Sequence, residues 1–556
     1  MTQPVEISFV ETASDRLPDH RGRIAILVQP GGRLPSGLPR ATRDVVTRAL
    51  EAKAGRSLKP GSALELAFPA GLQAEALQLV SLPQDATALE ARKAGAAIGA
   101  RIARSHTLVM AGGHRHADEV ALGLALRAYD FDVYQTKRPE EEESGAPATL
   151  ADGSAAASGA DPTADAPAQT PQDVSARGLA PDARLGDAAG PDAAGPDAPE
   201  AAHGSPPAPD KARVTFMAKD PQALARTARD AAAVAEGVFF TRDLVNEPAN
   251  VLTTSDFADR LAAMEEIGIE VEVLDEDQLA ELGMRALLAV GQGSDSPSKV
   301  VVMRWNGAGD DRAPLALVGK GVVFDTGGIS IKPGAGMEEM TMDMGGAGVV
   351  AGVMRTLALR RARANVVGLV GLVENMPDGR AYRPGDIIRS MKGDTIEVVN
   401  TDAEGRMVLA DVLWYAQSRF APAAVIDLAT LTGAVIVALG HDHAGVFAND
   451  DALAEGIVAA GRSQGEGAWR LPLGASYDTL IKSRLADMKN SGGRAAGSIT
   501  AAQFLQRFIR KDQPWAHIDI AGVALPPGGT DMAPKGASGW GVLTLDRLVR
   551  DRFEDQ

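Results

Sequence analysis

Four acidic residues in two separate stretches of the chain are the side chains most able to do chemistry. Asp402 and Glu404 lie two apart, so in an extended segment their carboxylates point the same way. Asp325 and Asp343 lie upstream, and we expect the two stretches to converge on one site. Four carboxylates cannot share a pocket as anions unless cations offset their charge. Two divalent metal ions would do so, and such sites place the ions about 3.5–4 Å apart, activate a bridging water and stabilise the tetrahedral intermediate of hydrolysis.

Three basic residues accompany these carboxylates: Lys320, Lys332 and Arg406. Arg406 stands at the start of an expected helix, where its guanidinium and the free backbone N–H groups suit an anion. A helix cap explains the same stretch without any ligand. In that interpretation Asp402 caps the helix, Glu404 lies in its first turn, and Arg406 forms a surface ion pair. The residues of this stretch alone leave both interpretations open.

The elements that must position these residues are a strand, a turn and a helix. Residues 394–399 alternate polar and apolar side chains as a half-buried strand does, and residues 406–417 carry apolar side chains at helical spacing. The turn between them carries Asp402 and Glu404. A second apolar strand, 315–318, leads into the upstream acidic stretch. Because turns at the carboxyl ends of parallel strands bind ligands in α/β sheets, we expect the site at that edge.

Several longer motifs resemble those of one enzyme family. The stretches NTDAEGRMVLAD, VGKGVVFDTGGISIK and MDMGGAG are similar to signatures of the leucyl aminopeptidase (cytosol aminopeptidase) family, peptidase family M17. RDLVNEPAN, ATLTGA and WAHIDIAG extend the resemblance, which covers essentially all of the chain from Phe239 to its C-terminus. Because several long motifs occur in the right order, the match is specific.

The resemblance implies a site for two divalent ions, manganese or zinc. Asp325 and Glu404 would bridge the two ions. Lys320 and Asp343 would bind one of them, and Asp402 would bind the other. A lysine must lose its proton to bind a metal, and two adjacent cations favour that loss because they depress its pKa. For Lys320 taken alone, a surface ion pair is the simpler interpretation.

The resemblance also implies roles in catalysis and substrate binding. Lys332 matches the family's catalytic lysine, which stabilises charge on the tetrahedral intermediate. Arg406 matches the arginine that holds a bicarbonate-like anion, the general base for the water that attacks from between the metals. Met340, Thr430 and Leu431 lie at positions that resemble the substrate pocket, and ordinary core packing is the alternative for these three.

Together these implications describe a two-metal leucyl aminopeptidase. It would hydrolyse the N-terminal peptide bond of peptides, prefer leucine or other apolar N-terminal residues, and form a homohexamer. The alternative is a non-catalytic interaction protein with a degenerate metal site. Every charged residue of the motifs is present, which disfavours that alternative. The sequence departs from the family pattern in an insertion at 138–211 and in the ending GASGWGV.

A dinucleotide-binding fold is a further alternative. Gly346, Gly348 and Gly352 open an expected helix, and Glu374 follows the next strand, which loosely resembles a Rossmann fingerprint. The preceding stretch MEEMTMDM is a poor parallel strand, and Asp343 would face the pyrophosphate. The glycines are better explained by close packing between a helix and a strand.

The histidines are not expected to bind metal. His517 lies on an expected buried strand, so we predict a core residue. His114 and His116 precede an expected helix in a surface loop, and His441 and His443 follow a glycine in another expected loop.

Composition disfavours several classes of partner. The net charge is −17, which disfavours nucleic acid and anionic membranes. The chain has no cysteines, which excludes disulfides and thiolate metal ligands. The N-terminus lacks a basic start followed by an apolar run, and the sequence has no apolar stretch of about 18 residues. We therefore expect a cytoplasmic protein whose partners are peptide substrates.

The expected fold class is α/β with two domains. Residues 1–137 and 212–220 form a small N-terminal α/β domain, macro-like by the resemblance. A helix at 221–242 links it to a larger α/β catalytic domain, 243–556, with a mixed, mostly parallel sheet.

Residues 138–211 are rich in Ala, Pro, Asp and Gly and contain no aromatic residue, so we expect a disordered acidic insertion. Expected strands at 131–135 and 213–218 flank the insertion, which suggests that it interrupts the N-terminal domain.

Overall fold

The computed structural model describes residues 2, 4–29, 34–35, 37–102, 106–136 and 212–554. The expected insertion at 138–211 lies outside these residues. The described parts of Met1–Val133 and Asp210–Gln556 form one compact unit. Within the described parts of the chain, no helix combines the length and the apolar character needed to cross a membrane.

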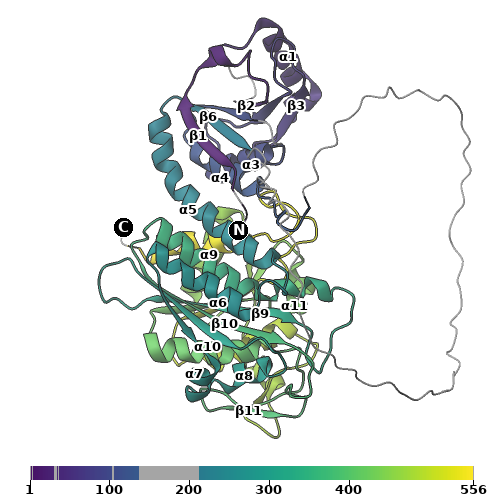
Figure 1. Ribbon diagram of the computed structural model, residues 1–556, viewed down its shortest axis with the longest axis vertical. Helices are drawn as coiled ribbons and strands as arrows, with labels where there is room; N and C mark the ends of the chain where they lie inside the picture. Colours follow the sequence, from purple (N-terminus) through teal and green to yellow (C-terminus); the bar gives the residue numbers. More distant parts are fainter. Residues whose placement is uncertain are drawn as a thin grey trace, which may run out of the picture. The chain divides into compact units, whose positions relative to one another are not determined.

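A six-stranded sheet combines the first strands of the chain with one later strand (Figure 1). In spatial order its strands are β1 (Glu6–Glu11), β6 (Arg213–Ala218), β5 (Thr107–Gly112), β2 (Arg23–Val28), β4 (Ala76–Ser81) and β3 (Ala63–Ala67). All neighbouring strands are parallel except β3 and β4. The accompanying helices are η1 (Ser14–Arg16), α1 (Arg40–Glu51), α2 (Lys53–Arg56), α3 (Ala88–Gly99) and α4 (Ala117–Arg127).

Both faces of this sheet are covered. Successive side chains of β2 point to opposite faces of the sheet, and they are buried on both. Ile24 and Ile26 pack in a cluster with Val46 of α1, whereas Ala25 packs in a cluster with α3 and α4. The expected strand at 131–135 is wrong, since residues 131–136 form turns and irregular structure. Both edges of β6 are already paired, with β1 and with β5, so no edge beside β6 remains for that segment.

A second sheet of eight strands follows α5 (Pro221–Asn246). In spatial order its strands are β15 (Ala468–Arg470), β14 (Ala444–Ala448), β17 (Trp515–Asp519), β13 (Ala424–Ala429), β9 (Leu315–Asp325), β10 (Asn365–Asn375), β8 (Lys299–Asn306) and β7 (Glu270–Leu274). The four parallel pairs are β15–β14, β17–β13, β13–β9 and β9–β10, and the other three pairs are antiparallel. The expected mixed, mostly parallel sheet is therefore confirmed.

The remaining helices lie between and after these strands. They are α6 (Thr254–Ala262), η2 (Ala263–Ile267), α7 (Glu276–Glu281), α8 (Arg285–Gly291), η3 (Met337–Met344), α9 (Gly345–Leu359), α10 (Gly405–Phe420), α11 (Gly433–Leu439), α12 (Asp451–Gln464), α13 (Ala475–Asp478), η4 (Thr479–Ile481), α14 (Gly497–Gln506) and α15 (Val542–Arg552).

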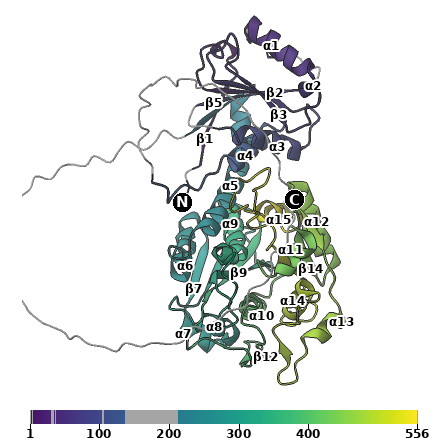
Figure 2. The same ribbon diagram turned by 90° about the vertical axis from the view of Figure 1, so that its right-hand side faces the viewer.

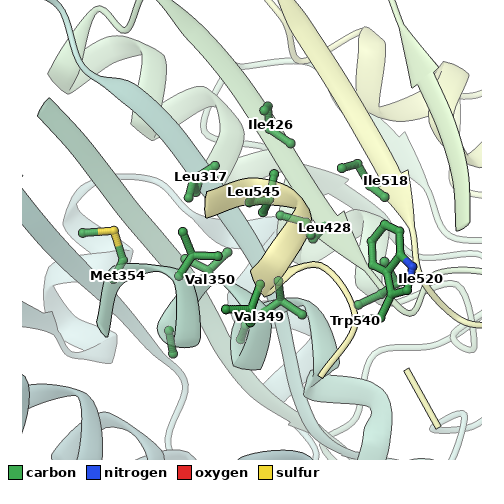
Figure 3. Close-up of a cluster of buried hydrophobic side chains, with 14 of the residues drawn as sticks. Leu317, Val349, Val350, Met354, Ile426, Leu428, Ile518, Ile520, Trp540 and Leu545 are labelled. Carbon is green, nitrogen blue, oxygen red and sulfur yellow. The ribbon is translucent and has the colours of Figure 1, made fainter. Parts of the chain in front are cut away.

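Helices α9 and α10 lie on opposite faces of the eight-stranded sheet (Figure 1, Figure 2). Successive side chains of β9 point to opposite faces of the sheet. Leu317 packs in the cluster that contains α9, and Val318 packs in the cluster that contains α10. Figure 3 shows Leu317 of the sheet next to Val350 of α9, in the cluster that also contains Ile426. Strand β9 is thus buried on both faces, so the charged residues it carries are held in a rigid interior.

A small third sheet contains β11 (Ile387–Arg389), β12 (Thr395–Glu397) and β16 (Met488–Lys489). The strand expected at 394–399 forms β12, which pairs antiparallel with β11 and parallel with β16. The turn with Asp402 and Glu404 therefore does not follow a strand of the main sheet, and that part of the expectation is wrong.

Candidate metal centre and active site

Strand β9 carries Lys320 into the protein interior, where it is 2% exposed. Lys320 Nζ donates hydrogen bonds to Asp343 Oδ1 at 2.7 Å and to the carbonyl oxygen of Thr430 at 3.0 Å. It also lies 2.8 Å from Glu404 Oε1. Gly405, the first residue of α10, allows this approach, because a Cβ there would lie 2.5 Å from Lys320 Cε. One lysine thus joins β9, η3 and the start of α10.

The charges in this cluster do not balance. Burial alone would lower the pKa of Lys320, but Asp343 and Glu404 outweigh burial and raise it above its ordinary value. Burial also favours the neutral form of Glu404, yet Lys320 and Lys332 hold its pKa below the ordinary value. For Asp343, burial prevails and raises the pKa well above its ordinary value. The nearby lysines are therefore too few to keep every buried carboxylate charged, and further cations would do so.

A second lysine bridges the other two acidic residues. Lys332 Nζ lies 2.8 Å from Asp325 Oδ2 and contacts Asp402 Oδ1. Asn375, at the end of β10, donates from Nδ2 to Asp325 Oδ1 at 2.7 Å. Burial and the charge of Glu404 raise the pKa of Asp325 to about 6. This half of the site also holds more acid than its cation can offset.

Three of the predicted ligands converge closely. Asp325, Asp343 and Glu404 each offer one carboxylate oxygen, and these three oxygens lie within 4.8 Å of one another. Asp343 Oδ2 and Glu404 Oε2 are buried, and neither has a hydrogen-bond partner among the described residues. Leaving a buried acceptor unsatisfied is costly, and bound cations would satisfy both oxygens. The donor set of carboxylate oxygens and one amine therefore fits divalent metal ions.

Arg406 lies in the first turn of α10 and is 7% exposed. Its Nη1 donates to the carbonyl oxygen of Asn490 at 2.8 Å, whereas its Nε has no hydrogen-bond partner among the described residues. Burial lowers the pKa of Arg406 to about 10, although the charge of Glu404 opposes this. A buried, incompletely satisfied guanidinium suits a small anion. Arg406 forms no ion pair with another described residue, unlike the surface ion pair of the helix-cap interpretation.

A cavity of about 1100 Å³ brings the predicted site together. Its wall includes all the predicted site residues: Lys320, Asp325, Lys332, Met340, Asp343, Asp402, Glu404, Arg406, Thr430 and Leu431. Two of these have structural contacts that the sequence did not indicate. Thr430 Oγ1 donates to Asp343 Oδ1 at 2.9 Å, and the backbone N–H of Leu431 donates to Asp519 Oδ1 at 3.1 Å. The segment after β13 therefore holds a predicted ligand in place as well as lining the cavity.

Sequence reasoning missed the side chains that orient the site. Asn375 was not singled out, although an asparagine at the carboxyl end of a predicted parallel strand was a usable signal. Asn490 was also missed: its Nδ2 donates to the carbonyl oxygen of Asn400 at 2.6 Å, beside the acidic turn. Tyr382 donates from its hydroxyl to the carbonyl oxygen of Thr401 at 2.8 Å. These residues come from distant parts of the chain, so spacing alone does not reveal them.

None of the histidines among the described residues lines the cavity. His517 is fully buried, and its Nδ1 lies 2.6 Å from Asp427 Oδ1, which confirms a core residue. His441 and His443 lie in a loop, as expected. His114 is also in a loop, but it is buried rather than on the surface, because its Nε2 reaches the carbonyl oxygen of Pro83 at 2.9 Å.

The glycines of α9 serve packing, so the dinucleotide-binding alternative is wrong. The stretch before them is the helix η3 and not a strand. A Cβ at Gly346 would lie 2.0 Å from the carbonyl oxygen of Leu428, and a Cβ at Gly352 would lie 2.1 Å from Thr241 Oγ1. The helix approaches the sheet and its neighbour too closely for any side chain at these positions.

An α/β sheet wrapped by helices, with a buried carboxylate and lysine cluster in a large cavity, defines a metallohydrolase type of site. Comparison with known proteins makes the class specific. Residues 239–546 match the model of the cytosol aminopeptidase family, catalytic domain. A probable cytosol aminopeptidase of Cereibacter sphaeroides is 54% identical over 557 residues, and one of Dinoroseobacter shibae is 54% identical over the same length. Both alignments cover 100% of each chain.

A solved structure agrees with these relatives. The bottromycin maturation enzyme BotP in complex with Mn is 30% identical, with a TM-score of 0.72, and the match covers 95% of this chain and 99% of that one. The chain therefore belongs to the cytosol aminopeptidase family, peptidase family M17, and is a metallo-aminopeptidase. It carries out metal-dependent hydrolysis of N-terminal peptide bonds. A non-catalytic interaction protein is excluded as the principal role.

Proposed function

We propose that Lys320, Asp325, Asp343, Asp402 and Glu404 hold two divalent ions, manganese or zinc. Two buried carboxylate oxygens, one on Asp343 and one on Glu404, support this proposal, because neither has a hydrogen-bond partner among the described residues. Asp402 is outside the tight group of three carboxylates, but Lys332 connects it to Asp325. When bound, the ions would supply an activated water and a Lewis acid for the scissile carbonyl.

Lys332 provides positive charge for the tetrahedral intermediate. Its side chain is 21% exposed on the wall of the cavity, so a substrate can reach it. In the metal-free protein, Asp325 and Glu404 outweigh the effect of burial and raise the pKa of Lys332 above its ordinary value. A fixed ammonium beside the reacting carbonyl stabilises the oxyanion that develops in the transition state.

Arg406 holds a bicarbonate-like anion that acts as the general base. The unpartnered Nε and the burial of the guanidinium support this role, because a buried cation binds a small anion strongly. When bound beside Arg406, such an anion would supply a general base for the attacking water. No histidine lines the cavity among the described residues, so the chain itself offers no imidazole for this step.

The cavity favours leucine or another apolar residue at the N-terminus of the peptide. Half-buried Met340 and Leu431 line it together with Ile436 and Leu471. Apolar walls with a few polar groups are typical of small-ligand pockets, and methionine adapts to irregular side chains. The free α-amine of the substrate belongs with the acidic cluster, at the polar end of the cavity.

Hydrolysis of leucine p-nitroanilide tests this function. We expect the metal-loaded protein to cleave it and to leave N-acetyl-leucine p-nitroanilide intact, because acetylation removes the free amine. We also expect kcat/KM for the leucine substrate to exceed that for the glutamate substrate. Cleavage of the acetylated substrate at a similar rate would contradict the exopeptidase proposal.

We further propose that the protein is a homohexamer. Exposed apolar side chains outside the cavity support association: Trp469 is 59% exposed and Leu485 52%. Light scattering of the purified protein is the test, and a monomeric mass at micromolar concentration would contradict it.

A further inference from the structure

The outer wall of the cavity carries a charged residue that the mechanism does not use. Arg494 lies in the segment between β16 and α14, and it lines the cavity together with Ser491 and Ala496 of the same segment. Arg494 is exposed, whereas the acidic cluster is buried, so it stands toward the solvent side of the same cavity.

The other charged residues of the cavity wall are engaged with one another or buried. Lys320 pairs with Asp343 and Glu404, and Lys332 pairs with Asp325 and Asp402. Arg494 differs from them, since it forms no side-chain hydrogen bond or ion pair with the described residues. It therefore presents a free guanidinium to whatever enters the cavity.

The segment that carries Arg494 is held in a defined conformation. Asn490, just before it, is fully buried, and its Oδ1 accepts a hydrogen bond from the backbone N–H of Val399 at 2.9 Å. The same asparagine accepts from Arg406 through its carbonyl oxygen. At the other end Ala496 has φ +51°, a left-handed conformation that alanine rarely adopts and that persists only where the surroundings impose it. Arg494 thus lies in a segment whose start is anchored beside Arg406 of the active site.

The chemistry of the substrate suggests what the free guanidinium binds. A peptide whose amine lies at the acidic cluster extends its leaving segment toward the solvent side of the cavity. An extended dipeptide or tripeptide spans only about 7–10 Å, so its terminal carboxylate remains inside a cavity of this size. Carboxylates are the anions that a guanidinium recognises best, through two parallel hydrogen bonds.

We propose that Arg494 binds a carboxylate of the leaving segment, so that the enzyme favours peptides that carry a carboxylate on the first residue beyond the scissile bond. This inference rests on the proposed aminopeptidase function and adds a specificity determinant to it. Two sources share the chemistry: the terminal carboxylate of a short peptide, and an acidic side chain at the same place.

The test compares substrates that differ only in that charge. We would measure kcat/KM for Leu-Gly against Leu-Gly-amide, and for Leu-Glu-amide against Leu-Gln-amide, in the wild type and in Arg494→Gln and Arg494→Lys. In the wild type we expect a preference of roughly threefold to tenfold for at least one carboxylate, weakening as salt increases. A preference for Leu-Gly over Leu-Gly-amide identifies the terminal carboxylate as the group that is bound. A preference for Leu-Glu-amide over Leu-Gln-amide identifies the acidic side chain.

The variants decide whether Arg494 is responsible. In Arg494→Gln, the ratio of kcat/KM for the substrate with the carboxylate to that for its uncharged counterpart should fall close to one. Arg494→Lys should retain part of the preference. Arg484→Gln is the matched control, because Arg484 is exposed and lies outside the cavity, and it should keep the wild-type ratio. An unchanged ratio in Arg494→Gln, or no carboxylate preference in the wild type, would overturn the inference while leaving the aminopeptidase function standing. Failure of the wild type to cleave any of these peptides would instead overturn the proposed function.

Discussion

Lys320 Nζ lies 2.8 Å from Glu404 Oε1, although each side chain is only 3% exposed. An ion pair this deeply buried is expensive to desolvate, and removing one partner leaves an uncompensated charge. Lys320 therefore has a different role in each form of the protein. In the metal-free protein it neutralises acid, and in the proposed metal-bound protein it is a ligand.

Replacing Lys320 with methionine should destabilise the metal-free protein. Methionine keeps most of the side-chain volume but removes the charge, so Glu404 remains buried without its cation, and the loss should be about 3–5 kcal/mol. We expect the melting temperature in chelator to fall, and added Mn²⁺ to raise it by more than in the wild type. Lys482→Met, at an exposed position outside the cavity, is the control. Equal melting temperatures for Lys320→Met and the wild type in chelator would contradict this account.

Metal binding should release protons. The pKa of Lys320 is raised in the metal-free cluster, so the amine must give up a proton before it can bind a metal. Calorimetric titration with Mn²⁺ in two buffers of different ionisation enthalpy measures that release directly. We expect the apparent affinity to increase with pH, and Lys320→Met to release fewer protons. A binding enthalpy that is independent of the buffer would argue against Lys320 as a ligand.

Lys332→Ala should lose most of its turnover while still binding metal. The ammonium is expected to stabilise the developing oxyanion, and removing one such group costs about 10²–10³-fold in kcat. Metal content, measured by elemental analysis after dialysis, separates this effect from loss of the metals. The same substitution at exposed Lys482 should leave both quantities unchanged. A near-wild-type kcat in Lys332→Ala would show that another group stabilises the intermediate.

The residues that sequence reasoning located best are those whose neighbours in the chain already define an element. Lys320 and Asp325 lie on one strand, β9, whose apolar start was expected at 315–318; Lys320 is in the middle of that strand and Asp325 is its last residue. Asn375 and Asn490 were missed because their contacts with Asp325 and Arg406 depend on how β10 and the segment after β16 pack in three dimensions.

Some short strands, and the pairing of strands far apart in the chain, were also not predicted from the sequence. Strands β15 and β16 have three and two residues, too few to show the period of two by which a strand is recognised. The strand at 395–397 was found, but its membership of the small third sheet was not, since β16, its parallel neighbour, lies about ninety residues later in the chain.

Asp411 should give the protein a pH-dependent stability. Its buried carboxylate on α10 accepts backbone hydrogen bonds from Ala286 at 2.8 Å, Leu287 at 3.1 Å and Met391 at 2.8 Å. Burial raises its pKa to about 7, and these donors counter the effect only in part. The folded protein therefore keeps a proton that the unfolded chain loses above about pH 4. The contribution of Asp411 to the free energy of unfolding is present below about pH 4 and is lost as the pH rises to about 7.

Asp411→Asn should remove this dependence, because asparagine does not titrate. We expect the melting temperature of the wild type minus that of Asp411→Asn to be larger at pH 5 than at pH 8, measured in chelator. Asp277→Asn, at an exposed position, should show a constant difference. A constant difference for Asp411→Asn as well would mean that its carboxylate is charged throughout this range.

We propose that the acidic cluster holds two divalent ions and that hydrolysis requires both. The most direct measurement strips the protein with chelator, adds Mn²⁺ in steps, and follows bound metal and leucine p-nitroanilide hydrolysis in the same samples. We expect no activity in the stripped protein, and an increase in activity that levels off near two ions per chain. Full activity in protein shown to contain no metal, or saturation at one ion per chain, would contradict it.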